Sequence, residues 1–320
     1  MKSFFVHAIL AATAWAAPEL VARGQSCKCF PGDACWPSTA QWNALNTTVS
    51  GRLIATTPLG SPCHDPTYDA AKCADLQSKW QFSEIHMDSS SSVMAPFFAN
   101  QSCDPFQPRE RPCTLGNYVV YAVDARTPGD IQAAIIFAKK FNIRFVVRNT
   151  GHDYNGRSTG RHCQYGGRLI PRASITNITS YTRLIGNTEG AIFIGVGTDV
   201  SSFGSKIQNS VVPAWRKTLV HATITTPWSF QAPWADMIAN QNLMTNKLIP
   251  AIEKLTPGGG VYQNEADFRQ PRWQQEFFGA NYNNLLCIKK ERDPEGFFYA
   301  LNGVGSEAWT IASNGRMCRA

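Results

Sequence analysis

The sequence has no hydrophobic run long enough to cross a membrane and no cluster of basic residues. Its most apolar stretch runs from Phe4 to Trp15, and no later segment approaches the about 20 residues that a bilayer-spanning helix needs. The 30 lysines and arginines are scattered, with no run longer than pairs such as Lys139 and Lys140. Nucleic-acid-binding surfaces are clustered basic stripes. We therefore expect neither a membrane nor a nucleic acid as partner.

Several motifs of other enzyme classes are also missing. There is no P-loop and no His-Glu-x-x-His helix, which excludes the usual nucleotidase and metalloprotease sites. Cys27-x-Cys29 is followed by no matching cysteine or histidine pair, so no zinc or other metal site is expected. Gly156-Arg157-Ser158-Thr159-Gly160 matches a hydrolase elbow, but Ser158 follows the preceding predicted strand by about ten residues instead of directly.

What the sequence does contain indicates an exported globular protein. Its 320 residues are 43% hydrophobic and 17% charged, an ordinary globular composition. Residues 1–17 resemble a secretory signal peptide, with Lys2, an apolar segment and a small-x-small cleavage site. Seven of the ten cysteines precede residue 114, which predicts a disulfide-linked N-terminal region whose pairing the spacing leaves open. Glycans are expected at the sequons of Asn46, Asn100 and Asn177.

Regular structure is predicted to begin after the cysteine-rich region. Residues 18–115 indicate loops and short helices, with a solvated loop at 89–92. Residues 118–123 and 143–147 have the β-branched and aromatic enrichment of strands. Between them Thr127, a proline and an acid predict a capped helix that ends near Lys140. Strand, helix and strand together predict two parallel strands, with a ligand loop after the second.

That loop, residues 148–160, carries three glycines between polar residues. Such backbone can turn its amides toward one anion, and Arg148 would add a positive charge. From the residues alone a phosphate site and an ordinary surface turn remain equally open.

Read as a whole, Arg-x-x-Gly-His-Asp-x-x-Gly-x-Ser resembles the flavin-attachment loop of the berberine bridge enzyme-like oxidases. The resemblance implies that FAD is joined to His152 through its 8α-methyl carbon, for which a neutral imidazole is a suitable nucleophile. It also implies that the surrounding residues hold the cofactor, namely Arg148, Asn149, Thr150, Gly151, Asp153, Gly156 and Ser158.

The C-terminal half is similar to the same family. Residues 213–216 and 233–236 resemble the end of its substrate-binding domain, and a helical pattern follows, with a kink expected at Pro250. Residues 262–298 resemble its C-terminal segment, which implies that Tyr262 and Asn264 line the flavin cavity, although packing and turn roles are equally open. A helix is expected over 281–292.

The resemblance predicts an α+β protein with the PCMH-type, vanillyl-alcohol-oxidase-like FAD-binding fold, in incomplete form. Beyond Gly160 we find no second part of the FAD domain, and the chain passes directly to Gly167, within a stretch that resembles the substrate domain. The expected divisions are a signal peptide (1–17), a cysteine-rich region (18–115), the first part of the FAD domain (116–160), a substrate-domain remnant (161–260) and a C-terminal segment (261–320).

Two functions of different class follow. The first is an FAD-dependent oxidase, expected to be a monomer, that takes a hydride from a CH–OH or CH–N carbon of a small molecule or sugar, with O2 as acceptor. Glu265 is the candidate base, and the substrate stays unassigned. The second is a secreted, inactive remnant without a complete flavin site. A third hypothesis is a cysteine-rich binding module, which requires that residues 18–115 fold alone. Cys163 is not expected to form a second bond to the flavin, because its surroundings do not match the family's cysteine motif.

Overall fold

The computed structural model describes residues 27–92, 101–152, 154–158, 165–203, 209–312 and 314–320. The proposed signal peptide, Asn100 and Cys163 lie outside them. The α-helices are α1 (Thr39–Thr48), α2 (Ala70–Lys79), α3 (Ser83–Met87), α4 (Pro128–Lys140), α5 (Ile178–Gly186), α6 (Trp234–Leu243), α7 (Ile249–Leu255), α8 (Trp273–Phe278) and α9 (Tyr282–Arg292). The strands are β1 (Leu53–Ala55), β2 (Tyr121–Val123), β3 (Tyr165–Pro171), β4 (Ile192–Gly197), β5 (Thr218–Thr225), β6 (Trp309–Ile311) and β7 (Met317–Arg319).

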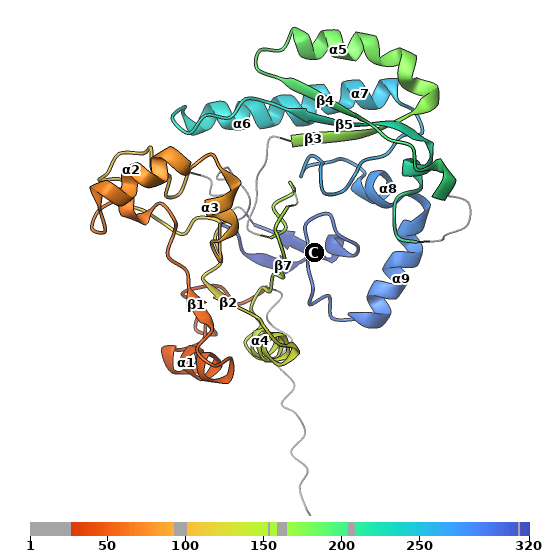
Figure 1. The fold of residues 1–320 in the computed structure, drawn as a ribbon. Helices are drawn as coiled ribbons and strands as arrows, with labels where there is room; N and C mark the ends of the chain where they lie inside the picture. The colour runs from red at the N-terminus through yellow and green to blue at the C-terminus, as the bar shows by residue number, and fades with distance from the viewer. Residues whose placement is uncertain (1–26, 93–100, 153, 159–164, 204–208, 313) are drawn as a thin grey trace, which may run out of the picture.

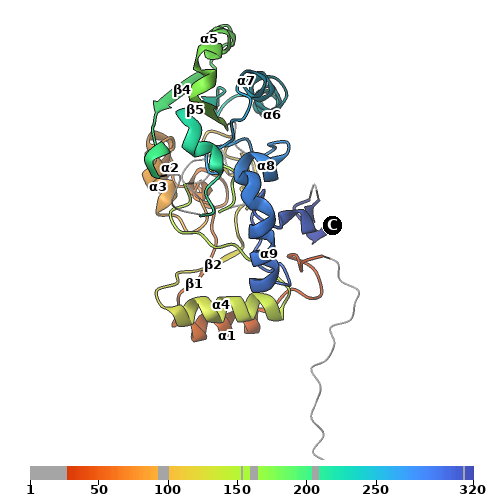
Figure 2. The ribbon, with the colours of Figure 1, turned by 90° about the vertical axis from the view of Figure 1, so that its right-hand side faces the viewer.

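The largest sheet has three antiparallel strands in the order β3-β5-β4 (Figure 1). Helices α5, α6 and α7 lie beside it in both views (Figures 1 and 2). The core between the sheet and the helices contains Ala222 and Ile224 of β5 with Tyr181, Leu248 and Ile252. Because side chains alternate along a strand, His221 and Thr223 of β5 lie on the opposite face of the sheet. That face carries the candidate site.

Helices α6 and α7 are joined by a single π-helical turn, Met244–Leu248. Pro250 is the second residue of α7 and has no amide hydrogen to donate to the preceding turn. The π turn lies directly on the N-terminal side of this proline, at the place where the sequence predicted a kink.

Helix α4 was predicted correctly, including its N-terminal cap. The Thr127 hydroxyl accepts a hydrogen bond from the Asp130 amide, and the Asp130 carboxylate accepts one from the Thr127 amide at 2.9 Å. Two strands were expected on either side of this helix, and only part of the first forms: β2 is three residues long and pairs with β1, antiparallel.

The second expected strand, residues 143–147, does not form. Within the described residues its pairing is limited to one parallel bridge between Ile143 and Cys29. A strand needs a neighbour along its whole length to satisfy its amides, and no described segment fills that position. The parallel strand-helix-strand unit was therefore wrong for this chain.

The cysteine-rich region folds as expected into short helices and loops held by disulfides. Cys29–Cys35, Cys63–Cys73 and Cys103–Cys113 each close a short loop. The solvated loop expected at 89–92 was wrong, because Ser91 and Ser92 are buried. The Ser92 hydroxyl lies 2.7 Å from Nδ1 of buried His86 and accepts a hydrogen bond from the Tyr118 phenol.

The fourth disulfide, Cys27–Cys318, joins residues 291 positions apart. The Lys28 amide donates to the Met317 carbonyl at 2.7 Å, and the Lys28 ammonium lies over the Trp309 ring. The start of the described chain is therefore attached to the β6–β7 hairpin near its end. Across the described ranges, no helix has both the length and the apolar character that a membrane span requires.

Candidate functional site

The glycine-rich loop is described from Arg148 to Ser158, apart from Asp153. Gly151 and Gly156 are buried and have φ angles of 82° and 68°, in the left-handed region that glycine adopts without strain. His152, Asn149 and Thr150 are exposed. The loop thus turns sharply at two glycines and presents His152 to solvent.

Arg148 of the loop is bound to backbone carbonyls of the preceding segment. Its Nη1 donates to the backbone carbonyls of Ser89 and Ser92, and its Nη2 donates to that of Met87. Arg148 therefore fixes the loop against the end of α3. Its side chain also lines the hollow described below, so its phosphate-binding role stays a prediction.

The loop docks directly on the C-terminal segment that begins at residue 261. The Tyr154 amide donates to the Asn264 carbonyl at 2.8 Å. The Arg157 guanidinium donates to the Gln263 carbonyl and to Asn264 Oδ1, each at 2.9 Å. The Asn264 amide in turn donates to the Tyr262 hydroxyl at 3.0 Å. The structure therefore brings Tyr262 and Asn264 beside the loop.

A large open hollow of about 1490 Å3 lies on another side of the loop. Its lining includes residues 115–125 and 143–149 together with Ser158 and Lys28. Most small-molecule sites have volumes of about 300–1,000 Å3, so the hollow can contain a ligand as large as a dinucleotide.

The open face of the three-stranded sheet carries a carboxylate with two polar neighbours. Oε2 of Glu265 accepts a hydrogen bond from the Thr223 hydroxyl at 3.1 Å and lies 3.4 Å from His221 Nε2. This approach requires Gly167 of β3, because a Cβ there would lie 1.9 Å from the Glu265 carbonyl oxygen. The candidate base is thus pressed against the sheet.

Aromatic rings lie around the His221 imidazole, and aliphatic side chains share its face of the sheet. The rings of Trp215 and Tyr262 lie 5.3 and 5.6 Å from the His221 imidazole, and 5.6 Å from each other. In the strand register Ile194 pairs with Thr223 and Val196 with His221, so all four side chains share one face.

Burial lowers the pKa of His221 below its ordinary value of 6.5, and the Glu265 carboxylate acts in the opposite direction. His221 is therefore neutral at neutral pH. The arrangement places a proton acceptor, a neutral imidazole and aromatic rings beside the glycine-rich loop.

Comparison with known proteins identifies the family. Residues 261–305 match the family model described as berberine and berberine like. The FAD-linked oxidoreductase ZEB1 of Gibberella zeae is 33% identical over 537 residues, covering 92% of this chain and 95% of that protein. The chain belongs to the berberine bridge enzyme-like family of FAD-linked oxidoreductases. The VAO-type flavoprotein oxidase VAO615 of Thermothelomyces thermophilus is 46% identical over 548 residues, covering 92% and 96%.

Solved structures show the fold. The crystal structures of the VAO-type flavoproteins MtVAO615 and MtVAO713 from Myceliophthora thermophila C1 superpose with TM-scores of 0.85 and 0.77. Each covers 92% of this chain and 100% of the solved chain, at 22% and 16% identity. The expected α+β fold of the VAO and PCMH superfamily is thereby confirmed. The sequence alignments above, of 537 and 548 residues, are longer than the 320 residues of this berberine bridge enzyme-like chain.

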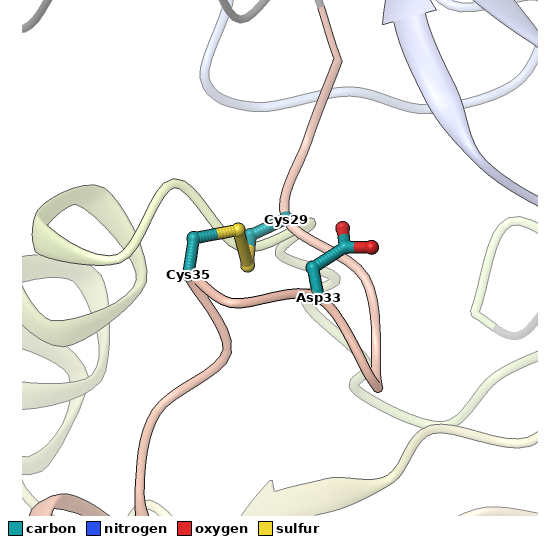
Figure 3. Close-up of side chains that lie close together, drawn as sticks. All are labelled: Cys29, Asp33 and Cys35. Carbon is teal, nitrogen blue, oxygen red and sulfur yellow. A yellow bond between two sulfur atoms is a disulfide. The ribbon is translucent and has the colours of Figure 1, made fainter.

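Among the described residues, one group of side chains of the kinds that bind metals lies outside the candidate site. Cys29, Asp33 and Cys35 lie within 4.8 Å of one another. Figure 3 shows that the two sulfurs are joined and that the carboxylate points away from them. Arg316 donates to both Asp33 oxygens, at 2.6 and 2.7 Å, and this ion pair lowers the pKa of Asp33 to about 2. The group therefore acts as a structural link.

The sequence did not single out His221 or Thr223, and it treated Trp215 only as part of a resembling segment. A signal was present in 218–225, where apolar Val220, Ala222 and Ile224 alternate with polar residues. This period of two marks a polar strand face.

Proposed function

We propose that the chain is an FAD-dependent oxidase that removes a hydride from a carbon bearing a hydroxyl or amino group of a small molecule, with O2 as the electron acceptor. The observation that carries the proposal is that the glycine-rich loop, whose Asn149 and Ser158 line the hollow, docks on residues 262–264. Two segments more than 100 residues apart that resemble flavin-contacting parts of the family thus form one surface.

The described residues could contact one part of FAD, its pyrophosphate and the adjoining dinucleotide. The loop, with left-handed Gly151 and Gly156, would hold the pyrophosphate by its backbone, and the hollow has room for the dinucleotide. Arg148, which also lines the hollow, would contribute positive charge from a guanidinium that three backbone carbonyls fix in place. Asn149 and Ser158 of the loop line the hollow, Thr150 is exposed next to Asn149, and Asp153 lies outside the described residues.

Bound FAD would supply the hydride acceptor. His152 would hold it covalently, since a neutral imidazole is a nucleophile and the side chain is exposed on the loop. Tyr262 and Asn264 would form the wall on the side of the sheet, and Asn264 fixes the Tyr262 hydroxyl through its amide. The protein base would accept the heteroatom proton from the substrate.

The test is an absorption spectrum of the purified chain, repeated on the acid-denatured and washed protein. We expect flavin absorbance in both samples for the unaltered chain. His152→Ala should lose the colour after denaturation, whereas Thr182→Ala, at an exposed position on α5, should keep it. A His152→Ala pellet that stays yellow would refute the tether.

A colourless unaltered chain would refute the oxidase and favour the inactive secreted remnant. We also propose that this chain lacks a segment that its relatives possess, near residues 159–164. Alignments of 537 and 548 residues against a chain of 320 support this, as does the open hollow.

Export is proposed as well. The four disulfides support it, because such bonds persist in oxidising compartments. Glycans at exposed Asn177 and partly exposed Asn46, the two sequons among the described residues, would be detected as a loss of protein mass after glycosidase treatment.

A further inference from the structure

We propose that two copies of the chain form a dimer in which their edge strands β4 pair antiparallel about a two-fold axis. Gly195 of one copy lies opposite Gly195 of the other, and the two three-stranded sheets become one continuous sheet. This interface does not depend on the proposed oxidase function, and it differs from the monomer expected from the sequence. The free backbone of β4, its side chains and the charges beyond its ends support it.

The two outer edges of the three-stranded sheet differ in what covers them. On the side of β3, the Leu169 amide donates to the Gly260 carbonyl at 2.7 Å. The Glu265 carbonyl also approaches β3 closely, because a Cβ at Gly167 would lie 1.9 Å from its oxygen. Residues 260–265 therefore cover this edge. At the opposite edge no described strand pairs with the outer side of β4 (Figure 1).

The alternation of hydrogen bonds along β4 identifies the backbone groups at its free edge. The Thr198 amide, directly after the strand, donates to the Leu219 carbonyl of β5 at 3.0 Å. Because such bonds recur at every second residue of an antiparallel pair, the even-numbered residues of β4 direct their peptide groups toward β5. The odd-numbered residues Phe193, Gly195 and Gly197 direct theirs away from the sheet. No described residue is hydrogen-bonded to these three amides, so they are available to another strand.

The side chains of β4 lack the features that usually protect an edge strand. Its 6 residues include no charge and no proline, which are common means of blocking edge pairing. Ile192, Ile194 and Val196 are 55%, 48% and 50% exposed on one face. On the other face, a Cβ at Gly197 would meet no atom within 4 Å. The edge is therefore apolar, uncharged and open to a second strand.

A second copy of the same strand is the occupant that fits this edge. Two-fold antiparallel pairing joins outward peptide groups to outward peptide groups, and it places aliphatic side chains opposite aliphatic side chains. Because residues 260–265 cover the β3 edge, each sheet offers one free edge among the described residues. The assembly therefore closes at two copies and does not extend into a fibre.

The charges beyond the ends of β4 select the register. Two registers overlap the strands equally and join outward peptide groups. In the first, Gly195 lies opposite itself and Ile194 lies opposite Val196 of the second copy. In the other, Ile194 lies opposite itself, and Glu189 of one copy comes opposite Asp199 of the second. Like charges opposite each other are destabilising, so the first register is the one we propose.

Sedimentation equilibrium of the disulfide-intact chain at about 1–200 μM measures the assembly, a range chosen because a short paired edge makes a small and weak interface. We expect twice the mass of one chain at the upper concentrations. Gly197→Pro removes one outward amide from each copy, and it should raise the dissociation constant about tenfold or more because two hydrogen bonds are lost. A proline whose amide position faces away from the sheet leaves the pairing with β5 intact. Gly197→Ala keeps the amide and places its methyl group in open space, so it should dimerise like the unaltered chain.

A second variant tests the same interface without changing the backbone. Ile194→Lys brings two like charges close together across the two-fold axis and should also raise the dissociation constant about tenfold. Ile288→Lys on α9 is the matched control, because Ile288 is 54% exposed against 48% for Ile194. A chain that stays monomeric at about 200 μM would overturn the proposal. Equal dissociation constants in Ile194→Lys and Ile288→Lys would overturn it as well, because the interface would then lie elsewhere.

Disulfide cross-linking tests the register. Every sample carries Cys287→Ser, because Cys287 is free and exposed and a disulfide there would also join two chains. Gly195→Cys places two cysteines directly opposite, with Cα atoms about 5.5 Å apart, which a disulfide can span. Ile194→Cys places them diagonally, about 7–8 Å apart. Mild oxidation should therefore produce the dimer band of a non-reducing gel about tenfold faster from Gly195→Cys. The reverse order would overturn the register, and no dimer band from either variant would overturn the pairing.

Discussion

Asp104 in the cysteine-rich region is a buried carboxyl group whose removal should stabilise the protein. Its side chain is fully buried, and neither Oδ1 nor Oδ2 has a hydrogen-bond partner among the described residues. Burial raises the pKa of Asp104 to about 7, only partly opposed by the charge of Arg111. His64 contacts the backbone carbonyl of Asp104 and leaves the carboxyl group alone.

The size and sign of the effect follow from linkage. The folded chain binds the Asp104 proton more tightly than the unfolded chain, in which the pKa is about 3.8. Wild-type stability therefore falls as pH rises from about 4 to about 7 and then levels off. The interval corresponds to roughly 4 kcal/mol, at about 1.4 kcal/mol for each tenfold change in proton affinity. Asp104→Asn has no proton to lose, so it should match wild type near pH 4 and exceed it by up to that amount above pH 7.

Urea unfolding at pH 4, 5.5, 7 and 8, with the disulfides intact, measures the difference. The exposed Asp75→Asn on α2 is the control and should show no comparable pH-dependent gain. The reasoning is refuted if Asp104→Asn is no more stable than wild type at pH 8, or if its advantage is the same at every pH.

Two further stability predictions concern buried and covalent links. Arg168→Ala should reduce the unfolding free energy by about 3 kcal/mol in urea titration. The change removes the nearer cation of buried Glu276, at 2.6 Å, and two hydrogen bonds to Thr256, while Arg272 stays 3.6 Å from Glu276; a loss below about 1 kcal/mol would contradict this. Replacing Cys27 and Cys318 together by serine should reduce stability by about 2–5 kcal/mol, since the disulfide closes a loop of 291 residues. An unchanged thermal midpoint would show that the loop is constrained by other contacts.

Features set by neighbouring residues in the sequence were predictable. Helix α4 was correct at both ends because its cap, Thr127 with Asp130, is encoded within four residues. Helix α9 was correct to within one residue because Asp293 and Pro294 end it. Residues 143–147 failed for the converse reason: a strand depends on a partner that the local sequence does not specify.

The candidate site likewise contains residues that the sequence identified and contacts that only the structure shows. The loop at His152 and the segment at Tyr262 were found by resemblance, and the structure adds that hydrogen bonds join them. The fixed position of Arg148 could not be foreseen, because it depends on the Met87 carbonyl at the end of α3 and on carbonyls of residues 89–92, which were taken for a solvated loop. The role of His221 could not be seen from the sequence, because it depends on the 3.4 Å approach of its Nε2 to Glu265, a residue 44 positions away.

The Cys27–Cys318 bond makes the described chain a covalent ring. A single cut by a protease anywhere inside that ring changes its connectivity without releasing a fragment, and the two pieces separate only after reduction. The N-terminal loops and the C-terminal hairpin would thus stay together even if the glycine-rich loop between them were cleaved. For a protein that we propose to be exported, such a ring preserves the assembly in surroundings where proteases are common.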